Sequence, residues 1–363
     1  MKKSIALLTG LIIAASAFAG CGSEEKPAAD SKPAETTTTA AETTTTAAET
    51  TAAPETTTAA ETTAAETTTE AKAEEPAAED EEEDYTTGDA SLDNVRNQDD
   101  IGENELLVLS FGTSFNDSRR LTIGAIEDSL EKAFPDYSVR RGFSANIIID
   151  HVKRRDNILI DDVEASLKRA EDNGVKTLVV QPTHLMNGLE YDDIVKEVGA
   201  HADAFDKVVF GEPLLTSDED FKRVEEAIVD WTKEYDDGKT AICFMGHGTE
   251  AESNAVYQKM QDLLTADGHA NYFVGTVEAT PSLDDVLAQV KKGEYERVVL
   301  EPLMVVAGDH ANNDMAGDEE DSWKSVFEAE GYKVECLLRG LGENEAIRQI
   351  YTDHAKAAID SIK

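Results

Sequence analysis

LLVLSFGTS (residues 106–114) and AICFMGHGTE (residues 241–250) are the two segments that decide the fold. Each is a short, mostly apolar run that breaks at a glycine, Gly112 in the first and Gly246 in the second. A continuous apolar run of this length is typical of a strand buried on both faces of a parallel sheet. The two segments therefore predict the opening strands of two similar α/β units.

The chain after residue 104 supports this repeat, because short β-branched runs alternate with stretches of helical periodicity. The expected strands are LLVLSF (106–111), YSVRRGF (137–143), TLVVQP (177–182), KVVFGEP (207–213), AICFMG (241–246), YFVGTV (272–277), RVVLEPL (297–303) and YKVECLL (332–338). We predict two α/β subdomains with four parallel strands each, residues 105–238 and 239–363, and a ligand cleft between them where the strands end. The last helix is expected to return across the first subdomain.

The first 104 residues are of two other kinds. Residues 1–21, MKKSIALLTGLIIAASAFAGC, place two lysines before a short apolar stretch that ends in small residues and a cysteine, as a secretory signal does. The ending resembles a bacterial lipobox, so we expect Cys21 to be lipidated and to become the N-terminus. Residues 22–104, rich in Thr, Ala, Glu and Pro, predict a disordered tether. The protein is therefore expected to be exported and lipid-anchored on the outer face of the bacterial cytoplasmic membrane, or periplasmic.

Charge and cysteine content exclude several kinds of partner. The formal net charge is −42, and residues 104–363 carry 52 acidic against 27 basic residues, a net of −25. A domain of that sign disfavours nucleic acid and suits a salt-exposed surface or the attraction of cations. Cys243 and Cys336 each lie inside an apolar run without CxxC spacing, which favours buried thiols over a disulfide or a thiolate metal site.

Three residues that can bind a metal follow expected strands of the second subdomain. His247 stands between two glycines in FMGHGTE, Glu278 ends the sixth strand in GTVEATPS, and His310 follows the seventh in GDHANND. Parallel strands end at one edge of a sheet, so the three side chains are expected to face one cleft. Two imidazoles and a carboxylate suit a divalent transition metal better than calcium, whose loop pattern is absent. A structural histidine is the simpler alternative for each, and a nucleophilic triad is disfavoured because GxSxG is absent.

The stretch LMVVAGDHANNDMAGDEEDSW (303–323) surrounds the last of these histidines. LMVVA is expected to belong to the buried seventh strand. The polar neighbours of His310 either join the site or serve as capping and turn residues: Asp309, Asn312, Asn313 and Asp314. The acids at 318–321 either guide cations inward or form a solvated helix N-terminus, which is the commoner explanation of such a run.

The first subdomain offers candidates at its own strand ends. His184 in QPTHLMNGLEYDD is expected to support the strand end or touch the ligand, and Glu190 faces the cleft or caps a helix. Ser110 and Thr113, at the glycine break of the first strand, are candidate substrate-binding residues, because a turn before a helix binds anions. Arg140, or the arginine after it, is a candidate partner for ligand carboxylates, and alternation lets only one of the pair face the cleft. GxxxxGK[ST] and GxGxxG are absent, so no nucleotide is expected.

The ordered set of motifs resembles one family. LLVLSFGTS, FPDYSVRRGF, VVQPTHLMNGLEYDD, FMGHGTE and LMVVAGDHANNDMAGDEEDSW resemble the anaerobic cobalt chelatases, the sirohydrochlorin cobaltochelatases of cobalamin synthesis, over residues 105–363. The resemblance implies the class II chelatase fold, with two flavodoxin-like halves around a tetrapyrrole, and metal insertion without ATP. Carried over to this sequence, the family's metal-site residues fall on His247, Glu278 and His310, and its acidic cleft residue of the first half falls on Glu190.

The resemblance also implies a mechanism. Neutral imidazoles of His247 and His310 would hold Co²⁺ as the substrate metal, and Glu278 would complete the ligand set or orient a histidine. His247, Glu278 and Glu190 are the candidate catalytic residues, since pyrrole N–H groups must lose protons as the metal enters. Ni²⁺ or Fe²⁺ are alternative metals, because the same ligands accept several divalent ions. Since the chain carries an export signal, the alternatives are a surface lipoprotein that captures haem, another tetrapyrrole or metal for uptake, and a purely structural surface protein.

Overall fold

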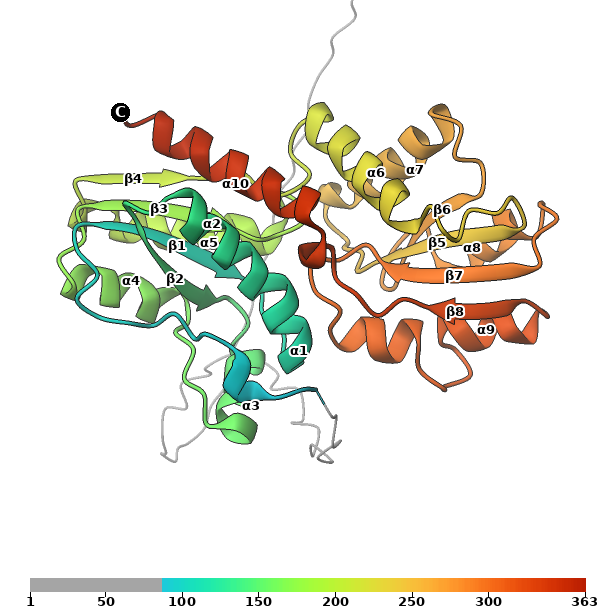
Figure 1. The fold of residues 1–363 in the computed structure, drawn as a ribbon, viewed down its shortest axis with the longest axis horizontal. Helices are drawn as coiled ribbons and strands as arrows, with labels where there is room; N and C mark the ends of the chain where they lie inside the picture. The colour runs from blue at the N-terminus through green and yellow to red at the C-terminus, as the bar shows by residue number, and fades with distance from the viewer. Residues whose placement is uncertain (1–86) are drawn as a thin grey trace, which may run out of the picture. The chain divides into compact units, whose positions relative to one another are not determined.

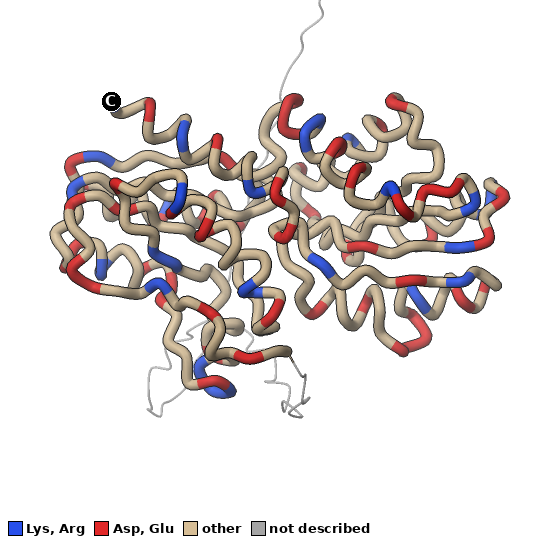
Figure 2. The backbone as a smooth tube through the Cα atoms, viewed as in Figure 1, with Lys and Arg blue, Asp and Glu red and all other residues tan. Residues whose placement is uncertain are grey.

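The computed structural model describes residues 87–363, so the expected signal, Cys21 and most of the expected tether lie outside the described residues. Residues 87–363 contain two four-stranded sheets, each wholly parallel, with helices on both faces (Figure 1). The fold class predicted from the sequence is thereby confirmed. Asp and Glu are spread over both halves (Figure 2). No helix in this part of the chain is both long enough and apolar enough to cross a membrane.

The first sheet has the strand order β2-β1-β3-β4. Its strands are β1 (Asn104–Ser110), β2 (Ser138–Phe143), β3 (Thr177–Pro182) and β4 (Lys207–Phe210). The helices of this half are α1 (Asn116–Arg119), α2 (Ala125–Ala133), α3 (Asn146–Asp156), α4 (Val163–Asp172) and α5 (Leu189–His201), with a π-helical turn η2 (Arg120–Gly124) and short 3-10 turns η1 (Ala90–Leu92) and η3 (Ala202–Ala204). The helix α6 (Asp218–Thr232) follows β4 but lies over the second sheet, beside α7 (Ala255–Ala266) (Figure 1). β1 lies between β2 and β3, and its side chains alternate between two cores, Leu106 and Val108 in one and Leu107 and Leu109 in the other.

The second sheet repeats this arrangement in the order β6-β5-β7-β8. Its strands are β5 (Thr240–Gly246), β6 (Tyr272–Thr276), β7 (Arg297–Pro302) and β8 (Lys333–Cys336). Its helices are α7 (Ala255–Ala266), α8 (Leu283–Val290) and α9 (Trp323–Ala329), with a π-helical turn η5 (Ala311–Met315) and 3-10 turns η4 (Glu252–Asn254) and η6 (Leu341–Glu343). Cys243 is buried and Cys336 half-buried, both as free thiols, and burial raises the pKa of Cys336 to about 11.

The last helix, α10 (Glu345–Asp360), packs against α2, β3 and β4 and so lies over the first half (Figure 1), and it also contacts α6. The hydroxyl of Tyr351 on α10 donates a hydrogen bond to the carbonyl oxygen of Thr183 at 2.9 Å, directly after β3. One apolar core contains side chains of both sheets and of α10, among them Leu106, Phe244 and Ile347. The two halves therefore share a core, which fixes the strand ends of one half relative to those of the other.

Two stretches differ from the sequence-based expectation. Residues 87–103 were expected to belong to the tether, but they lie against the first half, with Thr87 and Arg96 buried. Polar composition predicts disorder only when the charged side chains lack partners. In this segment Asp93 and Arg96 form ion pairs with residues of the first half. LMVVA is not part of the seventh strand, since β7 ends at Pro302. Instead the backbone of 304–305 accepts hydrogen bonds from 341–342 at 2.9 and 3.0 Å, so this run leaves the sheet.

Candidate metal centre and cleft

His247, Glu278 and His310 converge at one edge of the second sheet. The ligand atoms that they offer all lie within 4.8 Å of one another. Two metal–ligand bonds of about 2.2 Å span at most about 4.4 Å, so a small side-chain rotation brings all three atoms within bonding distance of one ion. The imidazole rings of His247 and His310 meet edge to face, with their centroids 4.7 Å apart. The carboxylate of Glu278, 54% exposed, lies 3.7 Å from Nδ1 of His247, so it can orient that ring or turn to complete the ligand set.

The ends of three strands position these side chains. His247 directly follows β5, Glu278 lies just beyond β6, and His310 directly precedes the π-helical turn after β7. The backbone N–H of Glu278 donates to the carbonyl oxygen of His247 at 2.9 Å, so strand pairing continues past the sheet and sets the two residues side by side. Gly248 has φ +91°, and a Cβ there would lie 2.8 Å from the nitrogen of Ala279. This turn therefore requires glycine.

Hydrogen bonds fix which nitrogen each histidine offers. Nδ1 of His310 lies 2.8 Å from Oδ2 of Asp314, and Nδ1 of His247 lies 2.7 Å from the carbonyl oxygen of Gly248. Both acceptors place the proton on Nδ1, so each neutral imidazole presents an unprotonated Nε2 as a ligand. Metal-binding histidines are commonly held in this way. Asp314 is thus part of the site, and the signal for this in the sequence is its spacing of four residues from His310 on a helical turn.

The three residues line one wall of a cleft of about 570 Å³ that draws on both halves. The first half contributes Ser110, Phe111, Gly112, Thr113, Ser114, Ile123, Ile148, Thr183, His184, Leu185, Met186, Gly188, Leu189 and Glu190. The second half contributes His247, Gly248, Thr249, Glu250, Ser253, Tyr257, Glu278, Met304, Val305, Val306, Gly308, Asp309 and His310. Apolar side chains with a few polar groups are typical of a site for an organic ligand of ring-system size.

Four candidates from the first half line this cleft. Ser110, at the end of β1, accepts a hydrogen bond from the hydroxyl of Thr183 at 2.7 Å, and Thr113 follows in the same turn. Glu190 is exposed in the first turn of α5. His184 is half-buried as a residue, and both its ring nitrogens are buried without a hydrogen-bond partner among the described residues. Burial lowers the pKa of His184 to about 4, so this imidazole is neutral at physiological pH.

Arg140 does not reach the cleft, and the prediction that it meets ligand carboxylates is wrong. Its guanidinium is fully buried beside β2, with Nε 3.3 Å from the carboxylate of Glu105 and Nη2 3.6 Å from that of Asp161. The neighbouring Arg141 is equally buried, in ion pairs with other acids. Among the described residues that line the cleft there is no Lys or Arg. The hydrogen-bond donors that this lining offers to ligand carboxylates are hydroxyls, imidazoles and backbone N–H groups.

Tyr257 lines the cleft without having been predicted from the sequence. Its hydroxyl accepts a hydrogen bond from the backbone N–H of Gly248 at 3.3 Å. A Cβ on Gly246 would lie 2.1 Å from its ring, so the ring occupies the space that this glycine leaves. Tyr257 thus supports the turn that carries His247. The signal in the sequence is the glycine at the end of a buried strand, which indicates a large neighbour but does not say which residue it is.

Comparison with known proteins agrees with this geometry. The family model described as cobalt chelatase (CbiK) matches residues 104–360. The chain is 36% identical over 255 residues to the sirohydrochlorin cobaltochelatase of Salmonella typhimurium, an alignment that covers 70% of this chain and 96% of that protein. It is 30% identical over 281 residues to the sirohydrochlorin cobaltochelatase CbiKC of Nitratidesulfovibrio vulgaris, covering 75% of this chain and 97% of that protein.

Solved structures show the same fold at low identity. SirB from Bacillus subtilis with Fe³⁺ matches with a TM-score of 0.52 and 11% identity, covering 72% of this chain and 98% of that one. The sirohydrochlorin chelatase SirB from Bacillus subtilis subspecies spizizenii, in complex with cobalt, matches with a TM-score of 0.50 and 12% identity, covering 72% and 97%. The family model and the two close relatives span nearly the whole described part, and the chain belongs to the cobalt chelatase (CbiK) family.

Proposed function

We propose that the protein catalyses the insertion of Co²⁺ into sirohydrochlorin without ATP. The observation that carries the proposal is the convergence of His247, Glu278 and His310, whose ligand atoms lie within 4.8 Å of one another on the wall of a ring-sized cleft. Membership of the cobalt chelatase family and the names of the close relatives support the same reaction. Cobalt is a substrate in this reaction and leaves with the product.

The reaction exchanges one divalent metal ion for two pyrrole protons, so the total charge of the macrocycle is unchanged. In the proposed mechanism Nε2 of His247 and of His310 holds the ion, and Glu278 completes or orients the set. All three side chains are partly exposed to the cleft, so coordination positions stay open for the pyrrole nitrogens. As these nitrogens bind, His247 and Glu278 are released from the metal and accept the pyrrole protons, with Glu190 as a further acceptor across the cleft.

The remaining cleft residues are proposed to bind the macrocycle. Ser110 and Thr113 offer hydroxyls where the cleft has no cationic side chain. His184 offers a neutral ring whose nitrogens are free of protein hydrogen bonds, so it can bond a ligand group without adding charge. Ni²⁺ and Fe²⁺ are proposed as alternative metals, because the order of intrinsic affinities and not this ligand set alone decides between them.

Insertion is tested by mixing the purified protein with sirohydrochlorin and Co²⁺ and following the absorbance of the macrocycle. We expect acceleration over the uncatalysed rate, loss of insertion in His310→Ala, and nearly unchanged sirohydrochlorin binding in that variant. His201→Ala is the matched control, since Nδ1 of His201 also lies 2.8 Å from a carboxylate, that of Glu171, away from the cleft. No acceleration by the wild type would exclude the enzyme, and equal loss of binding and insertion would make His310 a packing residue. A stable spectral change with haem alone would favour capture.

We further propose that the protein is an exported lipoprotein anchored through Cys21 at the outer face of the cytoplasmic membrane. The lysine-led apolar segment and the lipobox-like ending at Cys21 support this. Mass spectrometry of the N-terminal peptide is expected to show a lipidated cysteine, and Cys21→Ser is expected to move the protein out of the membrane fraction. An unmodified peptide that begins at Met1 would contradict the proposal.

A further inference from the structure

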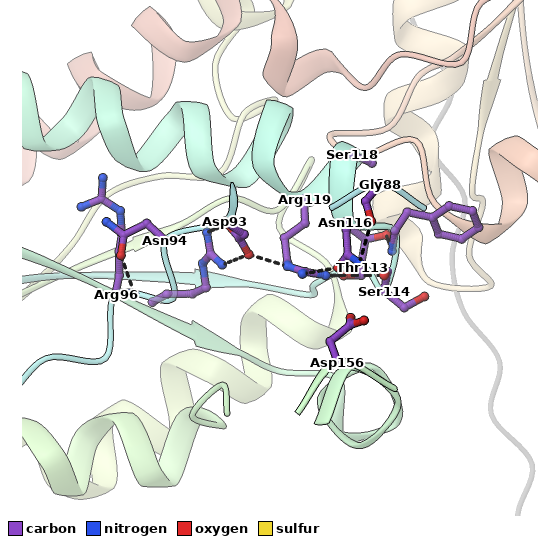
Figure 3. Close-up of polar contacts among 12 residues, drawn as sticks. Gly88, Asp93, Asn94, Arg96, Thr113, Ser114, Asn116, Ser118, Arg119 and Asp156 are labelled. Atoms are coloured by element: carbon purple, nitrogen blue, oxygen red, sulfur yellow. Dashed lines mark hydrogen bonds and ion pairs between the residues drawn. The ribbon is translucent and has the colours of Figure 1, made fainter. Parts of the chain in front are cut away.

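Residues 87–102, here called the strap, lie against the first half beside α1 and β2. The segment matched by the family model begins at residue 104, so the strap lies outside it. The side chain of its Asp93 is 1% exposed and bonds two guanidinium groups. Oδ2 lies 2.6 Å from Nε of Arg119 (Figure 3) and 2.7 Å from Nη1 of Arg141. Both arginine side chains are completely buried. The strap therefore supplies the negative charge that lies between two buried cations.

Arg119 connects this ion pair to the cleft. Its Nη1 donates to the carbonyl oxygens of Thr113 at 3.1 Å and of Ser114 at 3.5 Å (Figure 3). Thr113 and Ser114 both line the cleft. A planar guanidinium can serve the carboxylate and the carbonyls together because its donors point in fixed directions. The chain of contacts thus runs from Asp93 through Arg119 to the wall of the cleft.

The strap also holds α1, where the two halves meet. The carbonyl oxygen of Thr87 accepts a hydrogen bond from the backbone N–H of Asp117 at 2.6 Å. On the same short helix, the hydroxyl of Ser118 accepts a hydrogen bond from the backbone N–H of Ala307 at 3.0 Å, in the segment that leads to His310. α1 is therefore bonded to the strap and to the second half of the cleft at neighbouring residues.

The charge of Asp93 is what this arrangement depends on. Burial alone would raise the pKa of Asp93, but Arg141 and Arg119 outweigh burial and hold it below its ordinary value, so the carboxylate is ionised. Arg141 has a second acid partner, Glu127, with Nη2 2.7 Å from Oε2. Asp93 is the acid that bonds Arg119. Without its charge the buried guanidinium must shift toward another acceptor or toward water, because an unpaired buried cation is strongly unfavourable.

We propose that the strap is a positioning element of the cleft, in which Asp93 acts through Arg119 to fix Thr113 and Ser114 against the bound tetrapyrrole. The inference rests on the proposed function, since it concerns how the same cleft holds its substrate. Thr113 and Ser114 belong to the wall of the first half, whereas the metal ligands follow strands of the second. Loss of the strap contact is therefore expected to weaken binding of the macrocycle and to leave binding of the metal unchanged.

The test replaces Asp93 by Asn in the full-length protein, with Asp99→Asn as the matched control. Asp99 is also in the strap, but it pairs at 2.9 Å with Arg169 on the surface, away from α1. In Asp93→Asn we expect the KM for sirohydrochlorin to rise about tenfold, because the change removes binding that substrate and transition state share equally. We expect kcat and the affinity for Co²⁺ alone to stay close to wild type. Asp99→Asn should leave all three unchanged.

Arg119→Lys is the second variant, and it tests the role of the strap if Asp93→Asn does not fold. Lysine keeps the ion pair with Asp93 but cannot serve the carboxylate and both carbonyls at once, so the same rise in KM is expected. An unchanged KM in either folded variant overturns the proposal, as does a parallel loss of Co²⁺ affinity, which would mean general loosening. If the wild type shows no turnover, the proposed function fails, and the dissociation constant of sirohydrochlorin without metal then tests the strap by itself.

Discussion

Replacing Asp314 by Asn is expected to weaken Co²⁺ binding about tenfold. Oδ2 of Asp314 lies 2.8 Å from Nδ1 of His310, so it holds the proton on that nitrogen and keeps Nε2 free for the metal. Loss of such a partner costs metal-binding histidines about 10- to 100-fold in affinity. The carboxylate is 43% exposed, so solvent screens its charge. The loss of affinity should therefore come mostly from the orientation and tautomer of His310. This places it at the lower end of the roughly 10- to 100-fold range, about 1.4 kcal/mol of binding free energy.

The assay is calorimetric titration of Co²⁺ into wild type, Asp314→Asn and Asp318→Asn, without tetrapyrrole. Asp318 is the matched control, because it removes the same charge from the same stretch but is 97% exposed and bonds Lys324. We expect Asp318→Asn to bind Co²⁺ as the wild type does. Equal weakening in both variants would show that long-range charge, not orientation of His310, controls affinity. Wild-type affinity in Asp314→Asn would refute the role of the hydrogen bond.

Two further predictions concern stability. Burial lowers the pKa of His184 to about 4 in the folded protein. The free energy of unfolding is therefore highest above about pH 6.5, and it should fall by about 3 kcal/mol as the pH decreases from there to about 4. His184→Gln should remove that part of the slope in urea unfolding at several pH values, and an unchanged slope would contradict it. Gly246→Ala should lower the free energy of unfolding by about 1–3 kcal/mol through overpacking against Tyr257. Tyr257→Leu in the same chain should relieve part of this loss, and strict additivity would refute the clash.

The sheets could be predicted because their central strands are buried on both faces. LLVLS and AICFM each send alternate side chains into two different cores, and so the sequence shows an unbroken apolar run. Ser217 and Ser282 cap α6 and α8, each in a capping box with an acid three residues later, and such a cap depends on the local sequence alone. The metal site follows from the same logic, because residues just after parallel strands share one edge of the sheet.

The partners of the buried arginines could not be predicted in this way. Asp93 and Arg141 lie 48 positions apart, and no periodicity or turn signal relates them. Locally the segment around Asp93 is polar and resembles the spacer before it, so composition assigns it to the tether. Only the fold shows that its charges meet buried cations. The prediction for Arg140 was wrong for the same reason. Alternation says that the two adjacent arginines face opposite sides of the strand, but it does not show that each side already holds an acidic partner.

The internal repeat explains why the two halves of the cleft have different tasks. The turns after β1 and β5 match, with Gly112 at φ +106° and Gly248 at φ +91°. The residue before each glycine lines the cleft, and it is Phe111 in the first half and His247 in the second. One scaffold position therefore presents an apolar surface on one wall and a proposed metal ligand on the other. In the proposed mechanism the ion would be bound from one side only, which would leave its opposite side open to the ring and the first half free to hold the macrocycle.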